Sequence, residues 1–77
     1  MDFKEATDRL MEAGLTAHDV AGALGLATQT VRAMRLDPSS SAHRTAPGGW
    51  RKALAKLAQE RGEELRELAE TLEAEER

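Results

Sequence analysis

The 77-residue sequence predicts an all-α fold: three short helices, then a long or broken C-terminal helix that packs on them or dimerises. Ala, Leu, Glu, Arg and Lys dominate the composition, and these residue types favour helices. Ile and Tyr are absent, and Phe3 and Trp50 are the only aromatic residues, so strand-forming runs are missing. A chain of this length forms one small domain, whose core is marginal by itself.

The first helix is expected over about residues 2–13. Asp2 can cap its N-terminus by accepting a hydrogen bond from a free backbone N–H. Gly14 can end it in the left-handed conformation. Its apolar stripe, with spacings of three and four, consists of Phe3, Ala6, Leu10 and Ala13.

The second helix is expected to run from Thr16 to about Leu24. The Thr16 hydroxyl can accept a hydrogen bond from the backbone of Asp19, and the Asp19 carboxylate can accept one in return. This is a capping box with Asp in place of Glu. Gly25 is expected to end the helix.

The third helix is expected to start at a Thr28 cap and to extend to about Leu36. Pro38 stops it, because proline biases the preceding residue away from helical geometry. Residues 37–49 are rich in Ser, Pro and Gly and are therefore predicted to form a loop.

Residues 50–77 form the C-terminal helical segment, in which Trp50 is expected to anchor the core. Gly62 interrupts the segment at a cost of roughly 1 kcal/mol relative to Ala, so it is either one long helix or two helices that meet there. The apolar stripe consists of Leu54, Leu57, Ala58, Leu65, Leu68, Ala69 and Leu72. The single domain is thus divided into residues 1–36, 37–49 and 50–77.

Residues 17–36, AHDVAGALGLATQTVRAMRL, resemble the twenty-residue helix-turn-helix of bacterial and phage DNA-binding regulators. That pattern has a small residue at its fifth position, here Ala21, and glycine at its ninth, here Gly25. Five further positions are apolar, and they are filled here by Val20, Leu24, Leu26, Val31 and Met34. All seven positions agree with the pattern, which covers about a quarter of the chain.

The spacing of this pattern has a physical reason. Two helices joined by a three- or four-residue turn cross at close range, so a side chain larger than Ala21 would hold them apart. Gly25 begins the turn, where a positive φ angle is cheap only for glycine. A helical hairpin without a role in DNA binding is the alternative, because glycine between amphipathic helices is common.

The resemblance implies a sequence-specific transcriptional regulator that places its third helix in the major groove of double-stranded DNA. Arg32 can donate two hydrogen bonds to guanine, and Gln29 can pair with adenine. Thr28, Thr30 and Arg35 are better suited to phosphate contacts. The alternative for each residue is simple exposure to solvent. The candidate DNA contacts are Thr28, Gln29, Thr30, Arg32, Ala33, Arg35, Arg44 and Lys52.

The net charge of −3 is unevenly distributed along the chain. Residues 1–59 carry eight basic and six acidic side chains, whereas residues 60–77 carry three basic and eight acidic ones. Between Arg32 and Lys56, six basic side chains stand against Asp37 alone. We therefore expect the basic middle to face DNA and the acidic end to face away from it.

The acidic C-terminal segment carries leucines at the spacing of a coiled coil. This stripe must be buried against its own domain, a second copy or a different protein. A homodimer is the preferred interpretation, because helix-turn-helix proteins read two-fold sites with recognition helices roughly 34 Å apart. The alternative function is an adaptor or antitoxin-like protein that binds a partner protein through this helix. The residues assigned to dimerisation are Leu54, Ala58, Leu65, Leu68 and Leu72.

Other classes of function are not expected. The chain has no cysteine, which excludes disulfides and thiolate metal sites and fits a reducing cytoplasm. His18 and His43 are too far apart in sequence for a convincing metal site, and no cofactor is predicted. Asp37, Ser39 and His43 lie in a loop that lacks the rigid scaffold of a hydrolase triad, so no catalytic residue is assigned. We expect neither a signal peptide nor a membrane-spanning helix.

Overall fold

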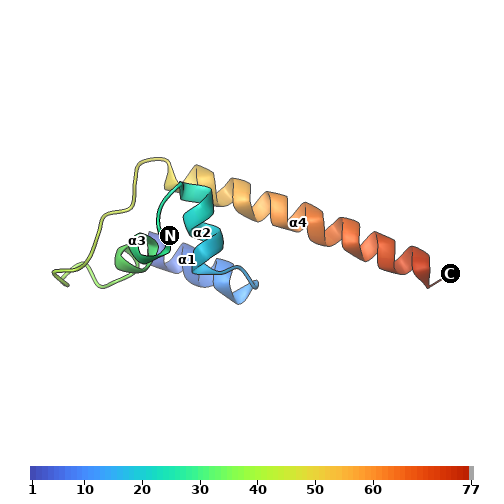
Figure 1. Cartoon of the computed structure of the whole chain (residues 1–77), viewed down its shortest axis with the longest axis horizontal. Coiled ribbons are helices and arrows are strands. Elements are labelled where there is room, and N and C mark those ends of the chain that lie inside the picture. Colours follow the sequence, from blue (N-terminus) through green and yellow to red (C-terminus); the bar gives the residue numbers. More distant parts are fainter. Residues whose placement is uncertain (77) are drawn as a thin grey trace.

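Four α-helices and no strand make up residues 1–76, the part of the chain that the computed structural model describes. They are α1 (Phe3–Glu12), α2 (Ala17–Leu24), α3 (Thr28–Met34) and α4 (Trp50–Glu75). Three short helices and the start of α4 pack together at one end, and the rest of α4 projects away from them (Figure 1). The molecule therefore measures 56 × 22 × 20 Å. The predicted all-α class is confirmed.

The N-termini of α1 and α2 are capped as the sequence predicts. The Asp2 carboxylate accepts a 2.8 Å hydrogen bond from the backbone N–H of Glu5. At α2, the Thr16 hydroxyl accepts from the Asp19 N–H at 3.2 Å, while the Asp19 carboxylate accepts from the Thr16 N–H at 2.8 Å. Each cap satisfies backbone donors that have no partner inside the helix.

The turn between α2 and α3 consists of three residues, Gly25 to Ala27. Gly25 has φ +68° and ψ +33°, the left-handed conformation expected of it. The Leu26 N–H then donates a 2.9 Å hydrogen bond to the Ala21 carbonyl, which closes the end of α2. The Leu26 side chain packs against the core. Only Ala27 then separates it from the first residue of α3.

Two predicted boundaries of α3 are wrong. Ala27 is the N-cap residue and makes no side-chain capping bond, so Thr28 is the first helical residue rather than the cap. The helix ends at Met34 and not at Leu36. Arg35 is its C-cap residue and bonds to α1 through its side chain, and Leu36 is exposed. The three-residue turn ends at Ala27, whose extended conformation makes it the residue that precedes the helix.

Thr16→Ala is expected to lower the free energy of unfolding by about 1 kcal/mol, because it removes one half of the capping box. Thr28→Ala is the matched control and should have a much smaller effect, since Thr28 makes no capping bond. Urea unfolding followed by circular dichroism measures both values. Equal losses in the two variants would contradict this assignment of the caps.

The core lies where α1, α2, α3 and the first turns of α4 meet. Trp50 packs on it and meets the Phe3 ring edge to face, with centroids 5.3 Å apart and planes at 82°. This confirms the expectation for Trp50. Thr7 is fully buried although the sequence pattern did not place it in the core. The buried apolar residues are Phe3, Leu15, Val20, Ala21, Val31, Met34 and Leu54.

The C-terminal segment is one helix that continues through Gly62. Its first three turns pack on α1 and α2, and its last residue that is not exposed is Arg61. Within residues 1–76, no helix combines the length and the apolar character needed to cross a bilayer; α4 has 26 residues but is rich in charge.

Candidate nucleic-acid interface

The two faces of α3 differ in exposure. Val31 and Met34 are buried on the inner face, whereas Gln29 and Arg32 are exposed on the outer one. The inner residues hold the helix against the core, so the outer side chains project from a fixed backbone. Thr28, Thr30 and Ala33 lie between the two faces and are half-buried.

The loop after α3 returns alongside this helix. The Arg44 N–H donates a 3.3 Å hydrogen bond to the Ala33 carbonyl near the end of α3. A shallow, polar depression forms between helix and loop. The depression is lined by Gln29, Thr30, Ala33, Ser41, Ala42, His43 and Arg44. The depression thereby brings together four residues predicted to contact DNA, namely Gln29, Thr30, Ala33 and Arg44. Arg44 lies beside α3 because of the course of the loop and not because it is near α3 in sequence.

Arg35 is engaged inside the protein. Its Nε donates a 2.9 Å hydrogen bond to the Thr7 hydroxyl, and its Nη2 forms an ion pair with the Asp8 carboxylate. The Thr7 hydroxyl in turn donates to the Phe3 carbonyl at 2.9 Å. Arg35 therefore fastens the end of α3 to α1, whereas its sequence position suggested a phosphate contact. No pattern in the sequence links residues 28 positions apart, so this clamp could not be predicted.

The Asp8 carboxylate is the acidic centre of this clamp. Hydrogen bonds from Lys4, at 3.0 Å, and from Arg35 lower the pKa of Asp8 below its ordinary value. A carboxyl group with a lowered pKa stabilises the fold above its ordinary pKa, and this contribution is lost as the pH falls below about 4. The clamp between α1 and α3 is therefore sensitive to acid.

Asp8→Asn should lower the stability at pH 7, and its deficit relative to the parent should be smaller at pH 3. As the pH falls toward the lowered pKa of Asp8, the parent carboxyl takes up a proton and the parent progressively loses the ion pair that the variant lacks. Urea midpoints at the two pH values measure the difference. Glu12→Gln on the same helix is the control, since no ion pair to it occurs within residues 1–76. A deficit of Asp8→Asn that is equal at both pH values would contradict this role.

The basic residues at the start of α4 have different surroundings. Lys52 is exposed, and it is not part of the lining of the depression beside α3. The Arg51 guanidinium lies 4.3 Å above the centroid of the Trp50 ring and donates a 3.1 Å hydrogen bond to the Met1 carbonyl. Arg51 therefore connects the N-terminal end of α4 to the start of the chain.

The predicted dimerisation stripe is divided by the fold. Leu54 is only 4% exposed and belongs to the core, so its assignment to an intermolecular surface is wrong. Ala58 is exposed, and Leu65, Leu68 and Leu72 are 55%, 53% and 52% exposed. Leu54 alone is covered by the chain's own helices, because α4 begins on top of them, and the outer part of α4 lies beyond them (Figure 1).

An ion pair marks the point where α4 leaves the rest of the domain. Arg61 lies 3.7 Å from the Asp19 carboxylate at the start of α2 and 3.6 Å from Glu64 on its own helix. The capping bonds from Thr16 lower the pKa of Asp19, with a smaller contribution from Arg61. Beyond Arg61, every described residue of α4 is exposed.

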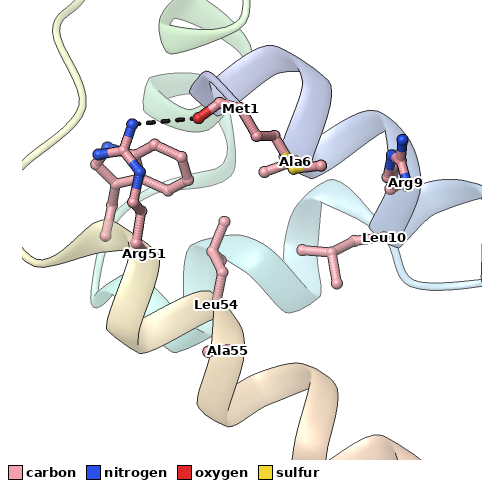
Figure 2. A pocket seen from close by; sticks show the side chains of 8 residues that line it. Met1, Ala6, Arg9, Leu10, Arg51, Leu54 and Ala55 are labelled. Atoms are coloured by element: carbon pink, nitrogen blue, oxygen red, sulfur yellow. Dashed lines mark hydrogen bonds between the residues drawn. The ribbon is translucent and has the colours of Figure 1, made fainter.

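An apolar groove of about 380 Å³ lies between α1 and the first turns of α4. Figure 2 shows Leu10 and Leu54 pointing into it from the two helices, with Arg9 and Arg51 at its opposite ends. The groove is lined by Met1, Ala6, Arg9, Leu10, Trp50, Arg51, Leu54 and Ala55. It is an open apolar surface beside the core, between α1 and α4.

Neither metal chemistry nor similarity to other proteins suggests a function. Within residues 1–76, no three His, Asp or Glu side chains are placed to hold a metal ion. No protein-family model, curated protein or solved structure matches the chain. The residues of this chain and their arrangement are therefore the basis for proposing its function.

Proposed function

We propose that this protein is a sequence-specific transcriptional regulator that binds a short, near-palindromic site in double-stranded DNA as a homodimer. The observation that carries the proposal is the two-sided character of α3. Its inner face is held by buried Val31 and Met34, while its outer face presents Gln29 and Arg32. A helix held in this way after a three-residue turn has the dimensions to enter the major groove.

Arg32 and Gln29 are proposed to read bases. Within residues 1–76, neither side chain makes a hydrogen bond or an ion pair, so both keep their donors available. Arg32 can donate two hydrogen bonds to the O6 and N7 atoms of guanine, and Gln29 can form a pair of bonds with adenine. Arg35, in contrast, already donates to Thr7 and Asp8 and is left out of the proposed contacts.

The remaining polar residues near α3 are proposed to contact phosphates. Thr28 and Thr30 lie along its half-buried edge, and Arg44 lies beside it on the returning loop. Lys52 can add charge at the start of α4. Phosphate contacts give most of the sequence-independent affinity and make it depend on salt. Since few side chains reach the bases, one copy is expected to bind weakly, which favours binding as a pair.

Selection from a random duplex library at moderate salt tests this proposal. The expected result is an enriched site with two related halves, whose affinity falls as salt concentration rises. A fluorescence-anisotropy titration of the enriched duplex against a shuffled one then measures specificity. Equal affinity for both duplexes, or no enrichment, would contradict the proposal.

A second candidate function rests on a different observation. The exposed leucines of α4 lie on a strongly acidic helix, which suits an adaptor or antitoxin-like protein that binds a different protein there. A purified chain that is monomeric, together with a stoichiometric partner lost in the Leu68→Asp variant, would favour it. A purified chain that forms dimers by itself would favour the first function.

A further inference from the structure

We infer that the exposed outer half of α4 docks antiparallel along the first turns of α4 in a second copy of this chain, beside its apolar groove. The inference rests on the homodimer of the proposed function, and it specifies the surface, the direction and the register of pairing. Two surfaces of opposite character on each copy carry it. One is the leucine-bearing acidic end of α4, and the other is the groove with Arg9 and Arg51 at its ends.

The pairing face is a stripe of α4 that lies next to the stripe occupied by Leu54. Its residues recur at alternating spacings of four and three, the pattern by which one face of a helix meets another in a coiled coil. All of its members are exposed, and Arg51 also contacts the Trp50 ring and the Met1 carbonyl of its own chain. The members are Arg51, Ala55, Ala58, Gly62, Leu65, Ala69, Leu72 and Glu76. We call them the pairing stripe.

The side-chain sizes along the pairing stripe select an antiparallel register. Small residues occupy its first half and leucines its second half. When two copies run in opposite directions with the two-fold axis just beyond Gly62, Ala55 faces Leu72 of the second copy and Gly62 faces Leu65. Ala58 then faces Ala69. Each leucine fits against a small residue, as close packing requires. In a parallel pair, each leucine would instead face the same leucine of the second copy. Ala55 would face Ala55 and Ala58 would face Ala58, so small residues would lie opposite small ones.

The same register pairs opposite charges at both ends of the interface. Arg51 faces Glu76 of the second copy, and Lys52 on the neighbouring position faces Glu73. The end of α4 carries seven Glu and one Arg over residues 62–76, so a parallel pair would bring like charges together. Antiparallel pairing places this acidic segment against Arg51, Lys52 and the Arg9 end of the groove. Charge and size therefore select the same direction.

Gly62 and the groove have a role in this arrangement. A glycine inside a helix costs about 1 kcal/mol relative to Ala, and a Cβ atom at Gly62 would meet nothing within 4 Å in the single chain. Next to the two-fold axis, its missing side chain lets the two helices approach closely. At the far end of the stripe, Leu72 of the second copy lies against Ala55 in this register. Ala55 lines the groove together with Leu10 and Leu54 of its own chain.

The arrangement also suits a two-fold DNA site. In this register the Trp50 residues of the two copies lie about 40 Å apart along the paired helices, at a rise of 1.5 Å per residue. The short helices of each copy, including α3, lie at this end of α4 (Figure 1). This separation is comparable with the roughly 34 Å between successive major-groove faces.

Two charge-reversal variants test the register without DNA. R51E/K52E places acids opposite acids in its own dimer, and E73K/E76K places bases opposite bases. Each variant alone should therefore dimerise at least about tenfold more weakly than the parent, as measured by sedimentation velocity. An equimolar mixture should dimerise like the parent, because each end of the mixed pair again joins opposite charges. Both double substitutions place favourable charges at the ends of α4, which supports the helix itself. R51E also removes the contacts of Arg51 with Trp50 and Met1, so circular dichroism of each variant alone checks that the fold is retained.

Cysteine pairs provide a second measurement, since the chain has no cysteine of its own. Mixed A58C and A69C chains should form a disulfide between copies under mild oxidation, and neither variant should do so alone. Self-linking of the single variants would show parallel pairing and overturn the inference. A parent chain that is still monomeric at about 100 µM would overturn it as well. So would a charge-reversal mixture that fails to associate. Loss of DNA selectivity with this dimer intact would instead refute the proposed function alone.

Discussion

Arg32→Ala is expected to abolish the preference of this protein for its selected DNA site while leaving its fold unchanged. A bidentate contact with guanine is worth about 1–3 kcal/mol, so each half-site should lose roughly tenfold to a hundredfold in affinity. Affinity for shuffled duplex should fall much less, since it depends on phosphate contacts. Arg32 is exposed, and it makes no contact that supports the core. Anisotropy titrations with both duplexes measure the two effects.

Arg66→Ala is the matched control for this variant. It removes the same charge from an exposed helical position, but one on the outer half of α4, which projects away from α3 (Figure 1). Its affinity for the selected site should stay within about twofold of the parent, as expected for a surface charge far from the contact. Equal selectivity of Arg32→Ala and the parent would refute the assignment of α3 as the reading helix.

Leu54→Ala should have the largest effect on stability. Leu54 is 4% exposed and packs in the core, so its truncation should cost about 2–5 kcal/mol. The total stability of a small domain is of the same order, and much of the protein should therefore be unfolded at room temperature. Urea unfolding, or thermal unfolding followed by circular dichroism, measures the loss.

Leu65→Ala is the matched control, since it makes the same change on the same helix at a residue that is 55% exposed. At protein concentrations too low for dimers, its unfolding should match that of the parent. At high concentration it should be less stable than the parent, because the parent gains stability from association. A large loss for Leu65→Ala at low concentration, or a small loss for Leu54→Ala, would contradict the division of α4 into a core half and an exposed half.

Local features of this fold were predictable because neighbouring residues create them. Asp2, Thr16 and Asp19 cap helices through bonds that span three residues, and Gly25 ends α2 in a conformation that glycine adopts cheaply. The prediction for Thr28 failed because the start of α3 is not set by neighbouring residues alone. Where α3 begins depends on how Leu26 packs on the core, and this packing is a tertiary contact.

Features that join distant residues were not predictable from the pattern. The clamp of Arg35 on Thr7 and Asp8 removes one arginine from the surface that the sequence assigned to DNA. Arg44 lies beside Ala33 of α3, and the sequence does not indicate the path of the loop that places it there. Periodicity alone placed Leu54 and Leu65 on one stripe, because it records the angle of a side chain around its helix and not what the helix packs against.

The sequence by itself determined the all-α class, the ends of the first two helices, most of the core and the polar outer face of the third helix. These follow from periodicity and from interactions within a few residues. Only the tertiary structure decided that α4 is continuous through Gly62, that it covers its own domain as far as Arg61, and that its remaining leucines are exposed. The physical reason is that burial depends on where the other helices end, and the short helices end before α4 does.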